Sequence, residues 1–175
     1  MKGPDGFVQA YNVQVAVDEL QLIVGQTVTT EPNDKKQLQP MIEKIQNQSG
    51  DIPDQVLADS GYCSEENLKA LADTTIDAYI ATGRQKHDSS PPPCRRGPLP
   101  QAATFTDRMT RKLQTKAGAT VYAARKGIVE PVFGQIKQGR GFRQFLLRGA
   151  DKVRSEWSLV CTTHNILKLY RLCES

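Results

Sequence analysis

The stretch that decides the fold spans eight residues and reads Gln55-Val56-Leu57-Ala58-Asp59-Ser60-Gly61-Tyr62. Its apolar start predicts a short buried strand, and the acid and glycine that follow predict a turn where that strand ends. A second short apolar run, Ala78-Tyr79-Ile80-Ala81, lies beyond a helix-like segment. A strand, a helix and a strand in this order predict parallel strands joined by a right-handed crossover.

Two longer β-patterns precede this unit. Residues 7–17 alternate apolar with polar or small side chains, as a half-buried strand does, and residues 22–30 are rich in β-branched side chains. The short connection between them predicts an antiparallel pair. A helix is expected next, capped by Asn33 or Asp34 and ended at Gly50, with apolar residues at helical spacing: Leu38, Met41, Ile42 and Ile45.

A helix is expected between the two short strands, with Ser64 as its N-cap and Asn67 as an imperfect capping-box partner.

The chain changes character after the second of the short strands. Residues 84–109 contain five of the ten prolines and have no hydrophobic periodicity, which predicts a flexible loop. From Thr110 the pattern is helical and basic, and residues 151–172 predict a long terminal helix with one apolar face.

The length of 175 residues fits one domain, since domains hold roughly 100–200 residues. We expect a single α/β domain in three parts: sheet and helices at 1–83, the Pro-rich loop at 84–109 and a basic helical part at 110–175. No apolar run approaches the roughly 20 residues of a membrane span, so a cytoplasmic protein without a membrane partner is expected. The four scattered cysteines predict reduced thiols rather than a disulfide framework.

The net charge of +4 conceals a strong asymmetry along the chain. Residues 1–83 carry 13 acidic and 5 basic side chains, whereas residues 84–175 carry 18 basic and 6 acidic ones. Residues 108–154 alone hold 12 Lys and Arg against Glu130 and Asp151. A segment this basic favours an anionic partner, and nucleic acid phosphate is the most plausible one, although a solvated basic face is the plainer alternative.

Two acidic residues are candidates for catalysis. Asp59 follows a predicted buried strand directly, which places its carboxylate at the sheet edge where ligands bind in open α/β folds. Glu130 stands in the basic segment, and two carboxylates from distant segments suit two-metal phosphoryl chemistry. Each also has a plainer interpretation, because Asp59 could simply start a turn and Glu130 could form a surface ion pair. Spacing alone leaves both interpretations open.

Two blocks of the sequence resemble a known family. Residues 56–68, Val-Leu-Ala-Asp-Ser-Gly-Tyr-Cys-Ser-Glu-Glu-Asn-Leu, are similar to the second catalytic block of bacterial insertion-sequence DDE transposases. Residues 125–137, Arg-Lys-Gly-Ile-Val-Glu-Pro-Val-Phe-Gly-Gln-Ile-Lys, resemble the third block of the same enzymes. Residues 141–149 and 157–170 also resemble the tail of that family. The resemblance covers nearly the whole chain, with its blocks in the correct order.

The third block of this family has a signature: Tyr, two residues, Arg, three residues, Glu, six residues, Lys. Tyr122 and Arg125 keep the first gap, and Glu130 and Lys137 keep the last. The gap from Arg125 to Glu130 is longer by one residue, whereas Lys126 has the family spacing before Glu130. The resemblance therefore leaves open whether Arg125 or Lys126 takes the role of the arginine.

The resemblance implies an α/β fold of the RNase H-like type, a mixed sheet with flanking helices, followed by the basic C-terminal helical region. In such enzymes three carboxylates hold two Mg²⁺ or Mn²⁺ ions, and Asp59 and Glu130 would be the second and third catalytic ligands. The implied partners are transposon-end DNA and a second copy of the chain or a full-length transposase. The residues expected to bind DNA are Tyr122, Arg125, Lys126, Lys137, Arg140 and Arg143.

The sequence departs from the family pattern at its start. The family's first catalytic Asp lies on an opening strand before the antiparallel pair, and here the only early acids near a strand, Asp5 and Asp18, fall at turns. We therefore expect a fragment that lacks the first strand and is inactive alone. Two alternatives are a non-catalytic DNA-binding or transposase-binding inhibitor and an unrelated α/β metal-dependent nuclease.

Overall fold

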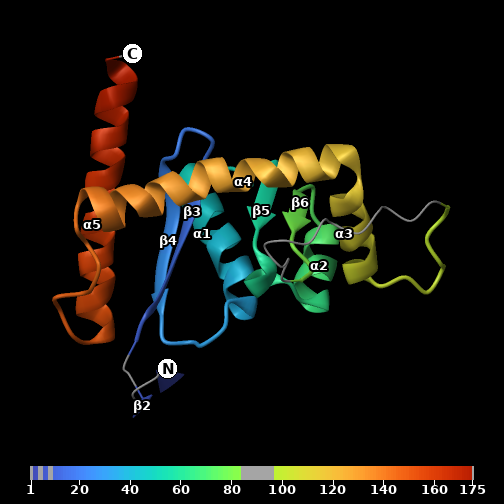
Figure 1. Cartoon of the computed structure of the whole chain (residues 1–175), viewed down its shortest axis with the longest axis horizontal. Helices are drawn as coiled ribbons and strands as arrows, with labels where there is room; N and C mark the ends of the chain where they lie inside the picture. The colour runs from blue at the N-terminus through green and yellow to red at the C-terminus, as the bar shows by residue number, and fades with distance from the viewer. Residues whose placement is uncertain (1, 4–5, 8–9, 84–96, 175) are drawn as a thin grey trace. The chain divides into compact units, whose positions relative to one another are not determined.

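The computed structural model describes the chain except for residues 1, 4–5, 8–9, 84–96 and 175 (Figure 1). The chain forms two compact units. Unit 1 combines Met1–Pro32 with Gly127–Ser175, and unit 2 is Asn33–Lys126. These units differ from the three sequence segments expected above, since unit 1 joins the two ends of the chain.

The larger sheet of unit 1 is the expected antiparallel hairpin, although its first strand begins at Asn12 and not at Phe7. Strand β3 (Asn12–Val17) pairs with β4 (Ile23–Thr29), and the register shifts between Ala16 and Val17. The connecting turn contains Gln21, the only described non-glycine residue with a positive φ, at 64°. Two short strands before the hairpin, β1 (Lys2–Gly3) and β2 (Gly6–Phe7), form their own antiparallel pair.

The helices of unit 1 cover this hairpin. The terminal helix α5 (Ala150–Cys173) lies beside β4, as Figure 1 shows, and confirms the helix predicted at 151–172. Helix α4 (Lys116–Gly134) belongs to this unit from Gly127 onward, passes through Pro131 and continues as the π-helical turn η3 (Gln135–Gly139). Pro131 lies inside α4 and does not end the helix. The core of this unit consists of Ile23, Val28, Val132, Ile136, Val153, Trp157 and Cys161.

Unit 2 contains the parallel strands. Strand β5 (Gln55–Ala58) pairs in parallel with β6 (Asp77–Ile80), and helix α2 (Glu65–Ala72) connects them as expected. The 3₁₀ turn η1 (Lys35–Gln37) precedes α1 (Leu38–Ser49). A second 3₁₀ turn, η2 (Ser60–Tyr62), follows β5. The apolar core of this unit is Leu38, Ile42, Ala58, Leu68, Leu71, Ile76, Ala78 and Ile80.

The expected helix ends are largely confirmed. Gly50 ends α1 in the left-handed conformation with φ 84°, which glycine adopts at little cost. Ser64 caps α2, and its hydroxyl oxygen accepts a hydrogen bond from the Asn67 amide nitrogen at 3.1 Å. The side chain of Asp34 makes no cap hydrogen bond at the start of η1, so Asp34 is not the side-chain cap that we expected.

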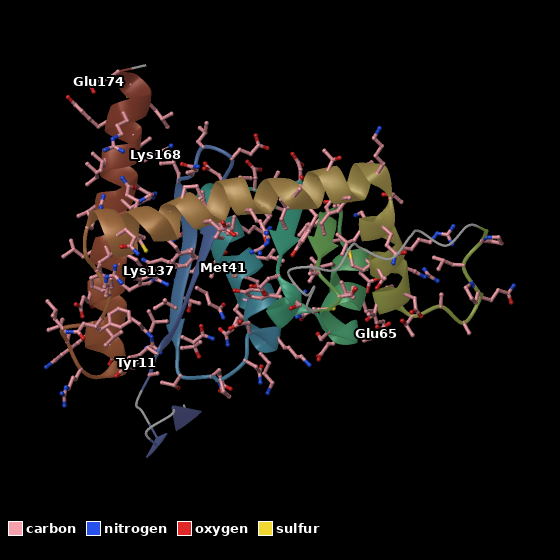
Figure 2. All side chains as sticks on the ribbon, in the orientation of Figure 1. Tyr11, Met41, Glu65, Lys137, Lys168 and Glu174 are labelled. Carbon is pink, nitrogen blue, oxygen red and sulfur yellow. The ribbon has the colours of Figure 1, made fainter. Side chains whose placement is uncertain are left out.

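The helix that follows the Pro-rich segment begins earlier than its predicted start at Thr110. Helix α3 spans Phe105–Gln114, because Thr104 and Asp107 form a reciprocal capping box at its first turn. Glu65, labelled in Figure 2, adds a second anchor, since its carboxylate accepts hydrogen bonds from the Phe105 and Thr106 amides at 2.5 and 3.1 Å. An acid at a helix N-terminus is favourable for the helix dipole. Residues 84–96 of the predicted loop lie outside the described part.

The described strands form three separate two-stranded sheets. We expected one mixed sheet, and this expectation is wrong for the described strands. A tight turn joins the antiparallel pair of β3 and β4, and the α2 crossover joins the parallel pair of β5 and β6. None of the described helices has both the length and the apolar content needed to cross a membrane. The described cysteines Cys63, Cys161 and Cys173 form no disulfide, and Cys94 lies outside the described residues.

Candidate functional site

Asp59 lies at the end of β5, where the sequence predicted it. Its backbone is extended, with φ −80° and ψ −179°, and it is the N-cap of η2. The Asp59 Oδ1 atom accepts a hydrogen bond from the Gly61 amide at 2.9 Å. Asp59 therefore does start a turn, as its plainer interpretation held. The same hydrogen bond fixes a carboxylate at the carboxyl end of a parallel strand pair, which is a ligand-binding position in α/β folds.

A second carboxylate lies beside Asp59. A Cβ atom placed on Gly61 would stand 2.9 Å from Asp34 Oδ2 and 3.0 Å from Asp59 Oδ1. Both acids therefore border the same small space, which is open only because residue 61 has no side chain. The turns η1 and η2 that carry them pack against each other in unit 2. No local pattern indicates this pairing, since Asp34 and Asp59 lie 25 positions apart in the sequence.

Two tyrosines of unit 2, Tyr62 and Tyr122, lie within the electrostatic reach of both Asp59 and Arg125. Burial raises the pKa of the Tyr122 hydroxyl. The Arg125 guanidinium lowers this pKa by its charge and by a hydrogen bond, and the negative charge of Asp59 raises it. Burial also raises the pKa of Tyr62, and the nearby charges of Asp34 and Asp59 raise it further. The Arg125 guanidinium carbon lies 5.8 Å from the centre of the Tyr122 ring. The acids are thus placed in an electrostatic environment shared with Arg125 and two neutral phenols.

Arg125 has an unused donor. Its Nε atom is buried and has no hydrogen-bond partner in the described part of the protein. Buried guanidinium donors are normally satisfied, and an arginine fork matches the oxygens of a phosphate or carboxylate. An anion close to Arg125 would satisfy this group.

Glu130 lies on α4 and belongs to unit 1, whereas Asp59 belongs to unit 2. Glu130 is exposed, and so are Lys126 on the same helix and Lys137 on η3. Lys137, labelled in Figure 2, has its ammonium 5.2 Å from the centre of the Phe133 ring. No described ion pair involves Glu130, so the surface ion-pair interpretation finds no support among the described residues.

The early acids do not supply an obvious replacement for a third carboxylate. The Asp18 Oδ1 atom accepts a hydrogen bond from the Leu22 amide at 2.8 Å, so Asp18 stabilises the β3–β4 turn, as its position in the sequence indicated. Asp5 lies outside the described residues.

Two of the predicted DNA-binding arginines border an open pocket in unit 1. Arg140 donates from Nη1 and Nη2 to the hydroxyl and the carbonyl oxygen of Thr163, both at 2.7 Å. Arg143 donates to the Gln138 side-chain oxygen at 2.5 Å. The pocket has a volume of about 550 Å³ and is lined by Arg140, Gly141, Phe142, Arg143, Gln144 and Leu146.

The donors near Asp59 suit a hard divalent cation. Asp34 and Asp59 offer carboxylate oxygens, the ligands that Mg²⁺ and Mn²⁺ prefer. Among the described residues, however, no group of three or more His, Cys, Asp and Glu side chains is close enough to hold an ion. A pair of carboxylates would be only part of a ligand set, which is compatible with the several waters that Mg²⁺ usually keeps.

Comparison with known proteins identifies the family. The model of the transposase DDE domain matches residues 2–166. The chain belongs to the transposase DDE domain family. DDE transposases bind DNA and typically use a divalent metal. Neither the curated proteins nor the solved structures provided a match.

Within this transposase domain, three of the eight residues predicted for the site, Asp59, Tyr122 and Arg125, lie in unit 2, where the charges of Asp59 and Arg125 both act on the Tyr122 hydroxyl. Lys126 is exposed in the same unit. The remaining predicted residues belong to unit 1 and are Glu130, Lys137, Arg140 and Arg143. Sequence reasoning missed Asp34 as a neighbour of Asp59 and treated it only as a helix cap.

Proposed function

We propose that this chain is the catalytic part of a bacterial insertion-sequence transposase with an RNase H-like fold. In this proposal Asp59 and Glu130 are the second and third acidic ligands of two divalent cations, Mg²⁺ or Mn²⁺. Its substrate is the DNA at the transposon ends, and its place of action is the cytoplasm. The observation that supports the proposal is that the charges of Asp59 and Arg125 both act on Tyr122 in unit 2, which relates a predicted catalytic acid to two predicted DNA-binding residues.

Each residue has a role that follows from its chemistry. Asp59 is held by the Gly61 amide and presents its other carboxylate oxygen to a cation. Arg125 has a buried donor without a protein partner, and this donor suits a DNA phosphate near that cation. Tyr122 orients the guanidinium by a hydrogen bond. When bound, two cations would activate the attacking oxygen and stabilise the leaving oxygen of an in-line displacement.

The basic residues of unit 1 would bind the DNA backbone away from the scissile phosphate. Lys137 and Arg143 are exposed, and the hydrogen bonds of Arg140 to Thr163 hold its guanidinium in place. Contacts of this kind add affinity that falls with salt, because each neutralised phosphate releases counterions.

We further propose that the first catalytic carboxylate is not supplied by the described residues and that this chain is inactive alone. The strands before β3, Lys2–Gly3 and Gly6–Phe7, carry no acid. Asp18 is engaged in its turn. A chain extended at its N-terminus by an acid-bearing strand should then cleave DNA with Mg²⁺ or Mn²⁺, whereas the chain as given should not.

Cleavage of terminal-repeat DNA by such an extended chain tests the proposal. Asp59→Asn and Glu130→Gln should each remove cleavage while retaining DNA binding, because they remove cation ligands. Glu43→Gln, an exposed acid on α1, is the matched control and should leave cleavage unchanged. Full cleavage by both the Asp59 and the Glu130 variants would refute the assignment of the catalytic acids.

A second candidate function is a non-catalytic inhibitor that binds DNA or a full-length transposase. One observation favours it: α5 exposes large apolar side chains, among them Leu159 at 65%, Ile166 at 62% and Tyr170 at 60%. A surface of this kind often contacts a partner. If the chain is an inhibitor, Leu159→Lys should abolish its co-purification with the full-length transposase. The chain extended at its N-terminus should then not cleave terminal-repeat DNA.

A further inference from the structure

Asn67 connects the two turns that carry Asp34 and Asp59. Its side-chain amide donates one hydrogen bond to the Lys35 carbonyl oxygen at 2.6 Å and another to the Tyr62 carbonyl oxygen at 2.8 Å. Lys35 is the first residue of η1, directly after Asp34, and Tyr62 is the last residue of η2. We call these two hydrogen bonds the Asn67 bridge.

The Asn67 bridge is a specific arrangement and not an incidental surface contact. Asn67 is only 6% exposed, and burying an amide is unfavourable unless its donors are bonded. Both N–H groups of the amide are used, and both acceptors are backbone carbonyls that no side-chain rotation can withdraw. The backbone N–H of Asn67 is bonded separately to Ser64, so the bridge is distinct from the helix cap.

The bridge fixes where the two carboxylates lie. Asp34 Oδ2 and Asp59 Oδ1 both stand about 3 Å from the position that a Gly61 Cβ would take. Two like charges in so small a space repel each other, and they stay together only if their backbones are held in place. The two acids lie 25 positions apart in the sequence, and the hydrogen bonds of Asn67 connect the turns that carry them.

We propose that Asn67 is a positioning residue of the transposase site, which holds Asp34 beside Asp59 so that both carboxylates act on the same divalent cation. This inference rests on the proposed function, in which Asp59 is a cation ligand. Asp34 then adds negative charge to the site and offers a second oxygen to the cation, directly or through its bound water. The repulsion between the acids is relieved when the cation binds, which makes their enforced proximity favourable for cation affinity.

Mn²⁺ affinity of the full chain, measured by electron paramagnetic resonance, tests this inference. Asn67→Leu should weaken Mn²⁺ binding by about tenfold or more, the usual loss when a residue that orients a ligand is removed. Ser64→Ala is the matched control, because it removes the α2 cap at the same helix end and leaves the bridge intact. Its Mn²⁺ affinity should stay within about twofold of the wild-type value.

A cycle with Asp34 separates positioning from general loss of structure. Asp34→Asn alone should also weaken Mn²⁺ binding. The double variant Asp34→Asn with Asn67→Leu should lose little more Mn²⁺ affinity than Asn67→Leu alone, because both substitutions act through the same carboxylate oxygen. Additive losses would show that Asn67 does not act through Asp34. Should Asn67→Leu fail to fold, Asn67→Ser keeps one donor and should show an intermediate loss.

A measurement without metal keeps this inference apart from the proposed function. Hydrogen exchange of the Gly61 amide, followed by NMR, should be faster in Asn67→Leu and unchanged in Ser64→Ala, because the bridge protects the turn that holds Asp59. Unchanged exchange together with equal Mn²⁺ affinities in both variants would overturn the role of Asn67. A wild-type chain that binds no Mn²⁺, or an Asp59→Asn variant that binds it normally, would overturn the proposed function instead.

Discussion

The side-chain amide of Gln21 donates a hydrogen bond to the carbonyl oxygen of Gly127 at 3.0 Å. Within α4 this carbonyl would normally accept from the residue four positions later, but that residue is Pro131, which has no N–H. Gln21 therefore supplies the donor that the proline removes. The Gln21 side-chain oxygen also accepts from the Lys168 ammonium at 3.1 Å, so one turn residue links α4 and α5.

Replacing Gln21 should destabilise the hairpin turn and its contacts with α4. We expect Gln21→Ala to lower the free energy of unfolding by about 1 kcal/mol, the usual net value of a lost hydrogen bond. Gln21→Gly should cost less, because glycine tolerates the positive φ of this position. Urea unfolding measures both. A Pro131→Ala background restores a helical donor to the Gly127 carbonyl, so Gln21→Ala should lower the free energy of unfolding by less there than in the wild type. Equal losses in the two backgrounds would contradict this explanation.

Adding a side chain at Gly61 should disturb the two acids. In Gly61→Ala the new Cβ would approach oxygens of Asp34 and Asp59 at 2.9 and 3.0 Å, so at least one carboxylate must move. We expect a loss of about 1–3 kcal/mol in stability, as for other overpacked sites, and weaker Mn²⁺ binding. Gly83→Ala is the control, because no described atom lies within 4 Å of its added Cβ. Equal effects of the two substitutions on unfolding and on Mn²⁺ binding would contradict the geometry.

The ion pair of Asp77 and Lys112 should give part of unit 2 an acid-sensitive stability. A hydrogen bond from Lys112 is the largest cause that lowers the pKa of Asp77 in the folded chain. The folded state therefore binds fewer protons than the unfolded state near the ordinary aspartate pKa of about 4. The contribution of the ion pair to stability is complete above the pKa that Asp77 has in the unfolded chain. This contribution is lost as the pH falls through the lower pKa that Asp77 has in the folded chain.

Unfolding experiments from neutral to acidic pH measure this contribution. Asp77→Asn should lose less stability on acidification than the wild type, because its side chain no longer takes up a proton. Lys112→Met should show the same weaker dependence, since it removes the cause of the lowered pKa. Lys112 also donates to the Ala78 carbonyl at 2.8 Å, so Lys112→Met is expected to be less stable at neutral pH as well. An acid dependence identical to that of the wild type in both variants would argue against this pair.

Arg125 should contribute to DNA binding through its guanidinium shape as well as its charge. Arg125→Ala is expected to weaken binding across sequences and to reduce the salt slope by about one, the change for one lost phosphate contact. Arg125→Lys should recover only part of the affinity, because lysine cannot form the bidentate contact. Gel shifts over a salt series measure both quantities. Lys69→Ala, an exposed basic residue on α2, is the charge-matched control and should change neither.

Local structure was largely predictable from the sequence. The alternation at 7–17 and the β-branched run at 22–30 predicted the hairpin of β3 and β4, and the apolar runs around Leu57 and Tyr79 predicted the parallel pair. Periodicity succeeds at these places because it records which side chains are buried. It failed at the start of α3, where a capping box and the distant carboxylate of Glu65 begin the helix at Phe105.

The site was predictable only in part. Asp59 could be proposed because a strand that ends in an acid is a local pattern, and Tyr122 and Arg125 could be proposed from the spacing of a resemblance. Asp34 and Asn67 could not, because their roles depend on contacts between turns that lie about 30 residues apart in the sequence. No local pattern specifies which buried carbonyl an amide will reach.

The sequence by itself determined the main strand pairs, most of the helix ends, the basic second half and the family of this protein. Each of these follows from side-chain type and spacing within short segments, where burial, capping and charge act locally. Only the tertiary structure decided that Gln21 replaces the donor missing at Pro131 and that Asn67 holds two acids against Gly61. These contacts are hydrogen bonds between groups far apart in the chain, and their partners are fixed only when packing brings the backbones together.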